Sequence, residues 1–163
     1  STEPHEEHTV KTLLSQLPFE KPLSLPEAKV DVLSVIRTFW EKATLIHVAC
    51  HRKRLRENPD RQSRHWYDLA MLIQAGLDKR ALSQREILES VVKHKKAFFN
   101  APYAHYDDCL NKKFRLIPDE DDEIHLRRDY KNMIDAGMFS QEPVEFQEIL
   151  NILKSFESVL AEE

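Results

Sequence analysis

The sequence contains only two glycines, Gly76 and Gly137, among its 163 residues. Phosphate-binding loops of the Walker type and the dinucleotide-binding fingerprint both need several closely spaced glycines, because the backbone must approach the phosphates. Neither loop can therefore occur in this chain. If the protein handles a nucleotide, side chains and a partner segment must hold the phosphates.

Eight prolines divide the chain into segments that are each long enough for one or two helices. Because glycine is so scarce, helix is the simplest interpretation of these segments. We expect a mainly α fold, a bundle of about five helices with at most one or two short strands. The expected helices cover residues 34–56, 63–75, 83–99, 121–136 and 144–161. A short helix over residues 8–16 and a brief strand within 30–35 are expected before them.

Apolar periodicity is clearest in the last expected helix, over residues 144–161. Its apolar side chains recur at the three- and four-residue spacing of a single helix face. We expect this face to lie in the core, with Phe146, Ile149, Leu150, Leu153, Phe156 and Leu160.

The composition is that of an ordinary globular domain, with 41% hydrophobic and 32% charged residues. No segment approaches the roughly 18 apolar residues of a membrane span. The polar residues 1–10 do not resemble a secretory signal. The two cysteines, Cys50 and Cys109, are far apart, which excludes a disulfide scaffold and a thiolate zinc site. We expect a cytoplasmic protein that makes no membrane contact.

Charge is unevenly distributed along the chain. Residues 41–117 hold 16 basic and 9 acidic side chains, a net charge of +7, whereas residues 118–163 hold 4 and 13, a net charge of −9. The basic part is suited to a polyanion, either RNA or nucleotide phosphate. The alternative is that it faces the acidic segment 119–123 of the same chain.

Lys42 occupies an unusual position on the expected helix 34–56. At 100° per residue it lies about 140° from Arg37, which belongs to the polar stripe with Glu41, Thr44, His51 and Arg52. The neighbours of Lys42 on its own side are apolar: Val35, Phe39, Leu45, Ile46 and Ala49. A lysine there is costly unless its ammonium meets an anion, either a carboxylate of the protein or the phosphate of a ligand. A snorkelling lysine at the edge of the core is the structural alternative.

Asp68 lies on the expected helix 63–75 and points away from its core stripe, beside Arg64 one turn earlier. One interpretation is an ordinary surface ion pair between Arg64 and Asp68 at i, i+4. The other is a carboxylate that Arg64 positions at a ligand site. The spacing by itself favours the ordinary pair.

Two histidines, His47 and His51, have a zinc-compatible spacing of one helical turn, and His65 is a candidate to join them. The sequence has no HExxH motif, and no acidic third ligand is implied. We therefore predict no metal site in this chain.

Five ordered motifs resemble the AbiEii/AbiGii toxin family of nucleotidyltransferases. They are residues 32–42 (VLSVIRTFWEK), 63–69 (SRHWYDL), 91–99 (VVKHKKAFF), 129–133 (DYKNM) and 137–139 (GMF). The resemblance implies a toxin of a toxin–antitoxin or phage-defence system. Such an enzyme transfers a nucleotide from an NTP, with Mg²⁺, to an acceptor such as the 3′ end of tRNA.

The resemblance also implies roles for four residues. Lys42 matches the family lysine that contacts the triphosphate, and Asp68 matches the later catalytic-site aspartate. Arg64 and Lys95 fall on basic positions of their motifs and are expected to bind the nucleotide or the acceptor.

The family's nucleotidyltransferase core carries a Gly-Ser motif and an Asp-x-Asp pair that holds Mg²⁺, and this sequence has neither motif. We therefore expect the C-terminal, mostly helical portion of such an enzyme, inactive without an N-terminal core. Residues 1–29 would form an extension or linker and residues 30–163 the helical domain. The alternative is a non-catalytic helical module that binds RNA or protein, in which Lys42 is structural. An antitoxin protein is a further expected partner.

Overall fold

The computed structural model describes residues 4–12, 15, 25–52, 60–139 and 142–162. It divides into two compact units, Ser1–Val35 and Ile36–Glu163. The sequence placed the domain boundary a few residues earlier, between 29 and 30. Three of the basic residues in the middle of the chain, at positions 53, 54 and 56, lie outside the described residues.

The first unit contains a two-stranded antiparallel hairpin, β1 (His5–Lys11) and β2 (Glu27–Leu33). His5 pairs with Leu33 and Lys11 with Glu27. The brief strand expected within 30–35 is confirmed by β2. The short helix expected over 8–16 is wrong for residues 8–11, which belong to β1, and positions 13, 14 and 16 lie outside the described residues. An isolated helix of this length is marginal in water, whereas strand pairing satisfies the backbone groups of both segments.

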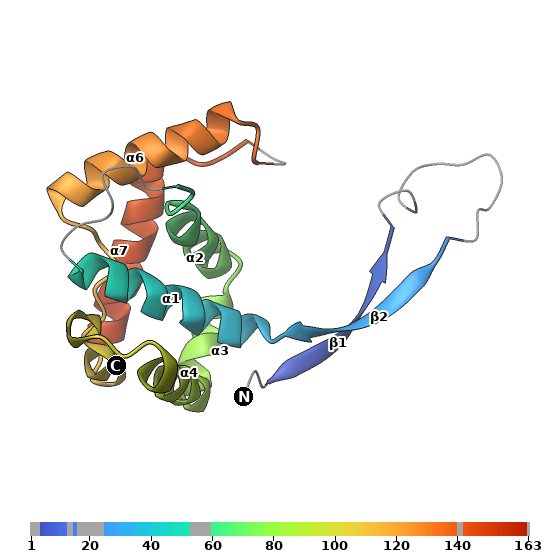
Figure 1. Cartoon of the computed structure of the whole chain (residues 1–163), viewed down its shortest axis with the longest axis horizontal. Coiled ribbons are helices and arrows are strands. Elements are labelled where there is room, and N and C mark those ends of the chain that lie inside the picture. The colour runs from blue at the N-terminus through green and yellow to red at the C-terminus, as the bar shows by residue number, and fades with distance from the viewer. Residues whose placement is uncertain (1–3, 13–14, 16–24, 53–59, 140–141, 163) are drawn as a thin grey trace. The chain divides into compact units, whose positions relative to one another are not determined.

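The second unit is helical, which confirms a mainly α fold with two short strands among the described residues. The described residues form seven α-helices and one 3₁₀ helix (Figure 1). These are α1 (Val35–His51), α2 (Arg64–Gln74), α3 (Leu77–Ser83), α4 (Arg85–Phe98), η2 (Pro102–Ala104), α5 (Tyr106–Leu110), α6 (Glu120–Asp135) and α7 (Phe146–Glu162).

The helices that sequence periodicity did not predict are the two shortest, α3 and α5. Gly76, at φ 74°, ends α2 as expected, but α3 begins at the next residue. Left-handed glycine therefore turns the chain here without ending the helical region. Expected helix 34–56 corresponds to α1, and its last four residues lie outside the described part of the chain.

The core stripe expected on the last helix is confirmed, since all six of its predicted side chains are buried in α7. Helix α7 packs against α2. In the view of Figure 1, α7 passes behind α1 and α2 lies above α1. Trp66 of α2 is fully buried, and its indole Nε1–H donates to the carbonyl of Leu116 at 3.0 Å. These contacts anchor α2, which carries Asp68.

The acidic segment 119–123 begins α6. The Asp119 carboxylate caps the helix by accepting the Asp122 N–H at 2.9 Å, and the acidic side chains of the first turn oppose the positive end of the helix dipole. A local role in helix formation thus accounts for this cluster of carboxylates. None of the helices in the described residues has the length and apolar content needed to cross a bilayer.

Candidate functional site

Lys42 and Asp68 meet where α1 and α2 come together. The Lys42 Nζ lies 2.7 Å from Asp68 Oδ2. The Lys42 side chain is 23% exposed and that of Asp68 is 40% exposed, so a ligand can reach both charges from solvent. The structure thus brings together the two residues for which the resemblance implies catalytic roles.

The Lys42 ammonium does meet an anion, but the wheel argument placed the surrounding helix face wrongly. Arg37 and Thr44, assigned to the exposed polar stripe, are buried. Thr44 is satisfied by donating to the Trp40 carbonyl at 2.8 Å, and Arg37 Nε donates to Glu41 at 3.1 Å. Lys42 lies instead on the partly exposed side of α1. A wheel records residue type, and it cannot detect polar groups whose hydrogen bonds are satisfied internally.

Asp68 takes its ion-pair partner from another helix. The sequence favoured Arg64, one turn earlier on the same helix, but the short contact of Asp68 is to Lys42. Arg64 is exposed. The favoured interpretation of an ordinary pair within α2 is therefore wrong.

His65 completes the group, and the sequence reasoning considered it only as a metal ligand. Its Nδ1 lies 3.1 Å from Lys42 Nζ. Burial, the largest cause, and the charges of Lys42 and Arg64 together lower the pKa of His65 to about 4. The imidazole is therefore neutral at pH 7. Since an ammonium can only donate, Nδ1 accepts and the ring proton resides on Nε2. The spacing His65 to Asp68, i to i+3 on one helix face, was the available signal.

Lys95 approaches the same region from α4. Burial lowers the pKa of Lys95, while Glu41 raises it and Arg37 lowers it. The charge of Lys95 also contributes to the low pKa of His65. All four residues named for the site, Lys42, Asp68, Arg64 and Lys95, therefore act electrostatically on this one histidine. Three of the four are cations, which suits the site to a polyanionic ligand.

The electrostatic coupling gives the first expected result. Replacing Lys42 with methionine keeps the volume of the side chain and removes its charge, so the pKa of His65 should rise from about 4. It should stay below 6.5, because burial, the larger cause, remains. NMR titration of the His65 ring measures the change. Lys131→Met on α6 is the control, and an unchanged His65 pKa in Lys42→Met would contradict the coupling.

The site does not fit the Mg²⁺ ions that the resemblance implies. Within the described residues, no group of three or more His, Cys, Asp or Glu side chains is arranged to hold a metal ion. Asp68 is the single carboxylate bonded to Lys42, and its Oδ2 is occupied by that ion pair. The donor set is thus suited to binding an anion rather than a divalent cation.

The histidines at zinc-compatible spacing have a structural arrangement. His47 is fully buried and uses both ring nitrogens, since Nδ1 accepts the Arg115 N–H at 3.0 Å and Nε2 donates to the His105 carbonyl at 3.2 Å. Its ring lies 4.5 Å from that of His51. With both nitrogens engaged, His47 links α1 to the segments on either side of α5 and cannot ligate a metal.

Asp129, from the fourth motif, secures the segment that leads into α2. Its buried carboxylate accepts three hydrogen bonds, from Arg61 N at 2.8 Å, Ser63 N at 2.8 Å and Ser63 Oγ at 2.6 Å. Arg61 has a φ of 55°, in the left-handed region that costs a side-chain-bearing residue energy. The Asp129 carboxylate therefore stabilises a strained turn just before the helix that carries His65 and Asp68.

An aromatic cluster also supports this helix. The ring of Tyr67 packs edge-on against that of Phe139, with 4.8 Å between the ring centroids. The centroid of the Phe139 ring in turn lies 5.4 Å from that of the Tyr130 ring. Gly137 permits this return of the chain, because its φ of 66° lets the Met138 N–H donate to the Met133 carbonyl. The last two motifs thus have packing roles that hold α2 in place.

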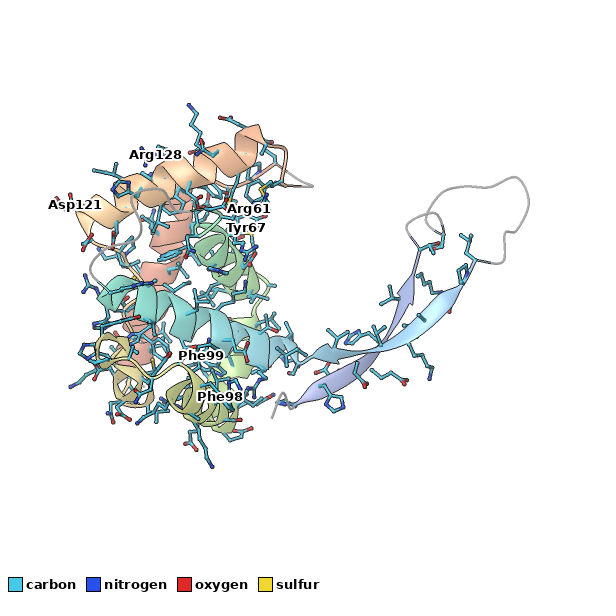
Figure 2. The ribbon with its side chains drawn as sticks, in the orientation of Figure 1. Arg61, Tyr67, Phe98, Phe99, Asp121 and Arg128 are labelled. Carbon is cyan, nitrogen blue, oxygen red and sulfur yellow. The ribbon has the colours of Figure 1, made fainter. Side chains whose placement is uncertain are left out.

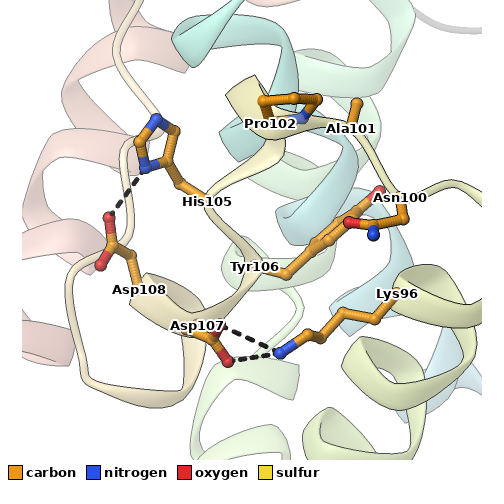
Figure 3. A pocket seen from close by; sticks show the side chains of 8 residues that line it. All are labelled: Lys96, Asn100, Ala101, Pro102, His105, Tyr106, Asp107 and Asp108. Carbon is orange, nitrogen blue, oxygen red and sulfur yellow. Dashed lines mark hydrogen bonds and ion pairs between the residues drawn. The ribbon is translucent and has the colours of Figure 1, made fainter.

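A small hollow of about 290 Å³ lies between the end of α4 and α5 (Figure 3). Asp107 and Asp108 line it, and Lys96 donates to both oxygens of Asp107, at 2.7 and 3.0 Å. His105 Nδ1 lies 3.8 Å from Asp108. The two carboxylates would repel a phosphate, and the positive charge of Lys96 is already neutralised by Asp107. This hollow is therefore unsuited to binding a phosphate.

Comparison with known proteins gives one finding. The family model described as "Nucleotidyl transferase AbiEii toxin, Type IV TA system" matches residues 1–162. The match includes all five motifs and all four residues named for the site. No curated protein and no solved structure matches the chain.

Proposed function

The chain belongs to the AbiEii nucleotidyltransferase toxin family of type IV toxin–antitoxin systems, and from this we propose that Lys42 binds the triphosphate of an NTP whose nucleotide is transferred to an acceptor RNA, such as tRNA. The observation that carries the proposal is the solvent-accessible Lys42–Asp68 pair, with its short 2.7 Å contact, among further cations.

The charges around Lys42 support this assignment. The ammonium is positioned by Asp68 and by the neutral ring of His65, so it needs little reorganisation when an anion arrives. A bound triphosphate would share or replace the carboxylate as its partner, with Arg64 and Lys95 adding positive potential. Asp68, with a free oxygen, would accept a hydrogen bond from a hydroxyl of the nucleotide or of the acceptor.

Transfer requires groups beyond those of the described residues. Carboxylates of an N-terminal nucleotidyltransferase core would hold Mg²⁺, which would supply the metal-ion chemistry of the transfer. The helical domain described here would supply the lysine and part of the acceptor surface. The complete toxin would act in the cytoplasm and be countered by an antitoxin.

Titration calorimetry with each of the four NTPs and Mg²⁺ tests the proposal. Lys42→Ala should raise the Kd for an NTP by about 10- to 100-fold, because it removes a charge-assisted contact to phosphate. Lys131→Ala, an exposed lysine on α6, is the matched control and should bind like the parent chain. Equal NTP affinity of the parent chain and Lys42→Ala would refute the role of Lys42.

A second candidate function is a non-catalytic module that binds RNA or protein. The observation that favours it is the completeness of the ion pair, since Lys42 already has Asp68 and His65 as partners. A structural lysine should cost stability when it is removed. A half-exposed pair is worth about 0–1 kcal/mol, so melting of Lys42→Ala close to that of the parent chain, with NTP binding lost, would favour the nucleotide site.

A further inference from the structure

Two adjacent phenylalanines at the end of α4 are unusually exposed. Phe98 is 71% exposed and Phe99 is 62% exposed, and Figure 2 shows both at the end of this helix. The centroid of the His94 ring lies 4.8 Å from that of Phe98, with the two rings tilted by 40°, and 6.5 Å from that of Phe99. These three rings, His94, Phe98 and Phe99, form what we term the aromatic platform. Exposing such large apolar rings is costly, and it marks a surface for interaction.

Lysines of α4 flank the platform. Lys93 and Lys96 are exposed on the same turn of this helix, and Lys96 is paired with Asp107, so Lys93 is the cation of this turn that we assign to a ligand. Lys95 precedes Phe99 by four residues, and the Phe99 N–H donates to the Lys95 carbonyl at 2.8 Å, so the two share a helix face. Because Lys95 also lowers the pKa of His65, this face leads from the platform towards the Lys42–Asp68 pair.

We propose that the aromatic platform stacks against the bases of single-stranded RNA, with Lys93 contacting the phosphate backbone. This inference rests on the proposed function, and it assigns the platform to binding the unpaired end of the acceptor RNA. Aromatic rings interleaved with lysines are suited to this ligand, because every base has a π face and every linkage a negative charge. Protein interfaces, in contrast, are depleted in lysine at their centre. The hollow beside α5 is lined by carboxylates and so would not hold the backbone.

Fluorescence anisotropy with a labelled single-stranded RNA of about 10 nucleotides, without NTP or Mg²⁺, tests the platform in the full chain. Phe98→Ala and Phe99→Ala should each raise the Kd at least about five-fold. Phe98→Trp and Phe99→Trp, which keep a π face, should bind within about two-fold of the parent. Lys93→Ala should lower the slope of log Kd against log salt by about 0.7, a change that the phenylalanine variants should not produce.

Leucine variants separate stacking from general apolar docking. Phe98→Leu and Phe99→Leu keep an apolar surface but lose the π face, so they should lose affinity for RNA like the alanine variants. Ile124→Ala on α6, where Ile124 is 65% exposed, is the matched control and should bind like the parent. All these positions are exposed, so melting curves should stay unchanged.

Three outcomes would overturn the inference. The first is that the parent chain does not bind RNA. The second is that both alanine variants bind RNA with the affinity of the parent. The third is that both leucine variants do so, which would point to a protein partner. NTP binding is measured in parallel. If NTP affinity does not depend on Lys42 but RNA affinity depends on Phe98 and Phe99, the proposed function fails and the platform stands.

Discussion

Replacing Asp129 with alanine is expected to lower the free energy of unfolding by about 3 kcal/mol. The carboxylate is 4% exposed and accepts hydrogen bonds from two backbone N–H groups and one hydroxyl. Alanine leaves the buried Ser63 N–H without its acceptor, leaves the Ser63 hydroxyl with only the weak acceptor Met133 Sδ, and frees the left-handed turn at Arg61. Chemical denaturation of the parent chain and the variant, followed by circular dichroism, measures the difference.

Asp135→Ala is the control for this loss, because Asp135 is an exposed carboxylate on the same helix, α6. Its unfolding free energy should change by less than about 0.5 kcal/mol. The turn at Arg61 leads into the helix of His65 and Asp68, so NTP binding by Asp129→Ala should also weaken under conditions where the variant is folded. If Asp129→Ala were as stable as Asp135→Ala, the proposed role of the carboxylate would be wrong.

Stability is expected to fall as the pH is lowered from about 6.5 to about 4, by about 2–3 kcal/mol from His47 alone. Burial lowers the pKa of His47 to about 4 from the ordinary 6.5. Above pH 6.5 the ring is neutral in both states. Between the two values the unfolded chain binds a proton that the folded chain does not, so acid favours unfolding. Below about pH 4 this contribution levels off.

Urea unfolding at several pH values between 4 and 8, together with NMR titration of the His47 ring, measures this dependence. His65 also has a pKa lowered to about 4, and burial lowers the pKa of His51, so both add to the slope in the same direction. His47→Gln should make the slope shallower. A slope in this variant equal to that of the parent, or a His47 pKa near 6.5 in the folded chain, would contradict the expectation.

Local patterns predicted the parts of the fold that local energetics decide. The six core residues of α7 follow from apolar spacing, because one face of a helix must be buried whatever it packs against. The same reasoning failed for Arg37 and Thr44. Thr44 donates to a carbonyl of its own helix, and Arg37 donates to Glu41 of α1 and to Ser90 of α4. It also failed for residues 8–11, where strand pairing with β2 prevails over helix formation.

The candidate site was predicted residue by residue from motifs, but its geometry was not. Lys42 and Asp68 are 26 residues apart, and no periodicity within either helix indicates that the two side chains meet. The sequence favoured Arg64 as the partner of Asp68, because a neighbour one turn away is the only contact that a single helix specifies. His65 was missed as a member for the same reason, since its partner Lys42 lies on another helix.

The sequence by itself determined the absence of glycine-rich phosphate loops, the mainly helical fold, the buried face of α7 and the family of the chain. Each depends on which residue types the chain contains and on their spacing and order along it. Only the tertiary structure decided that Lys42 pairs with Asp68, that Asp129 secures the start of α2 and that Phe98 and Phe99 stay exposed. These depend on how the helices pack, because a contact between elements is set by the many side chains that position both of them.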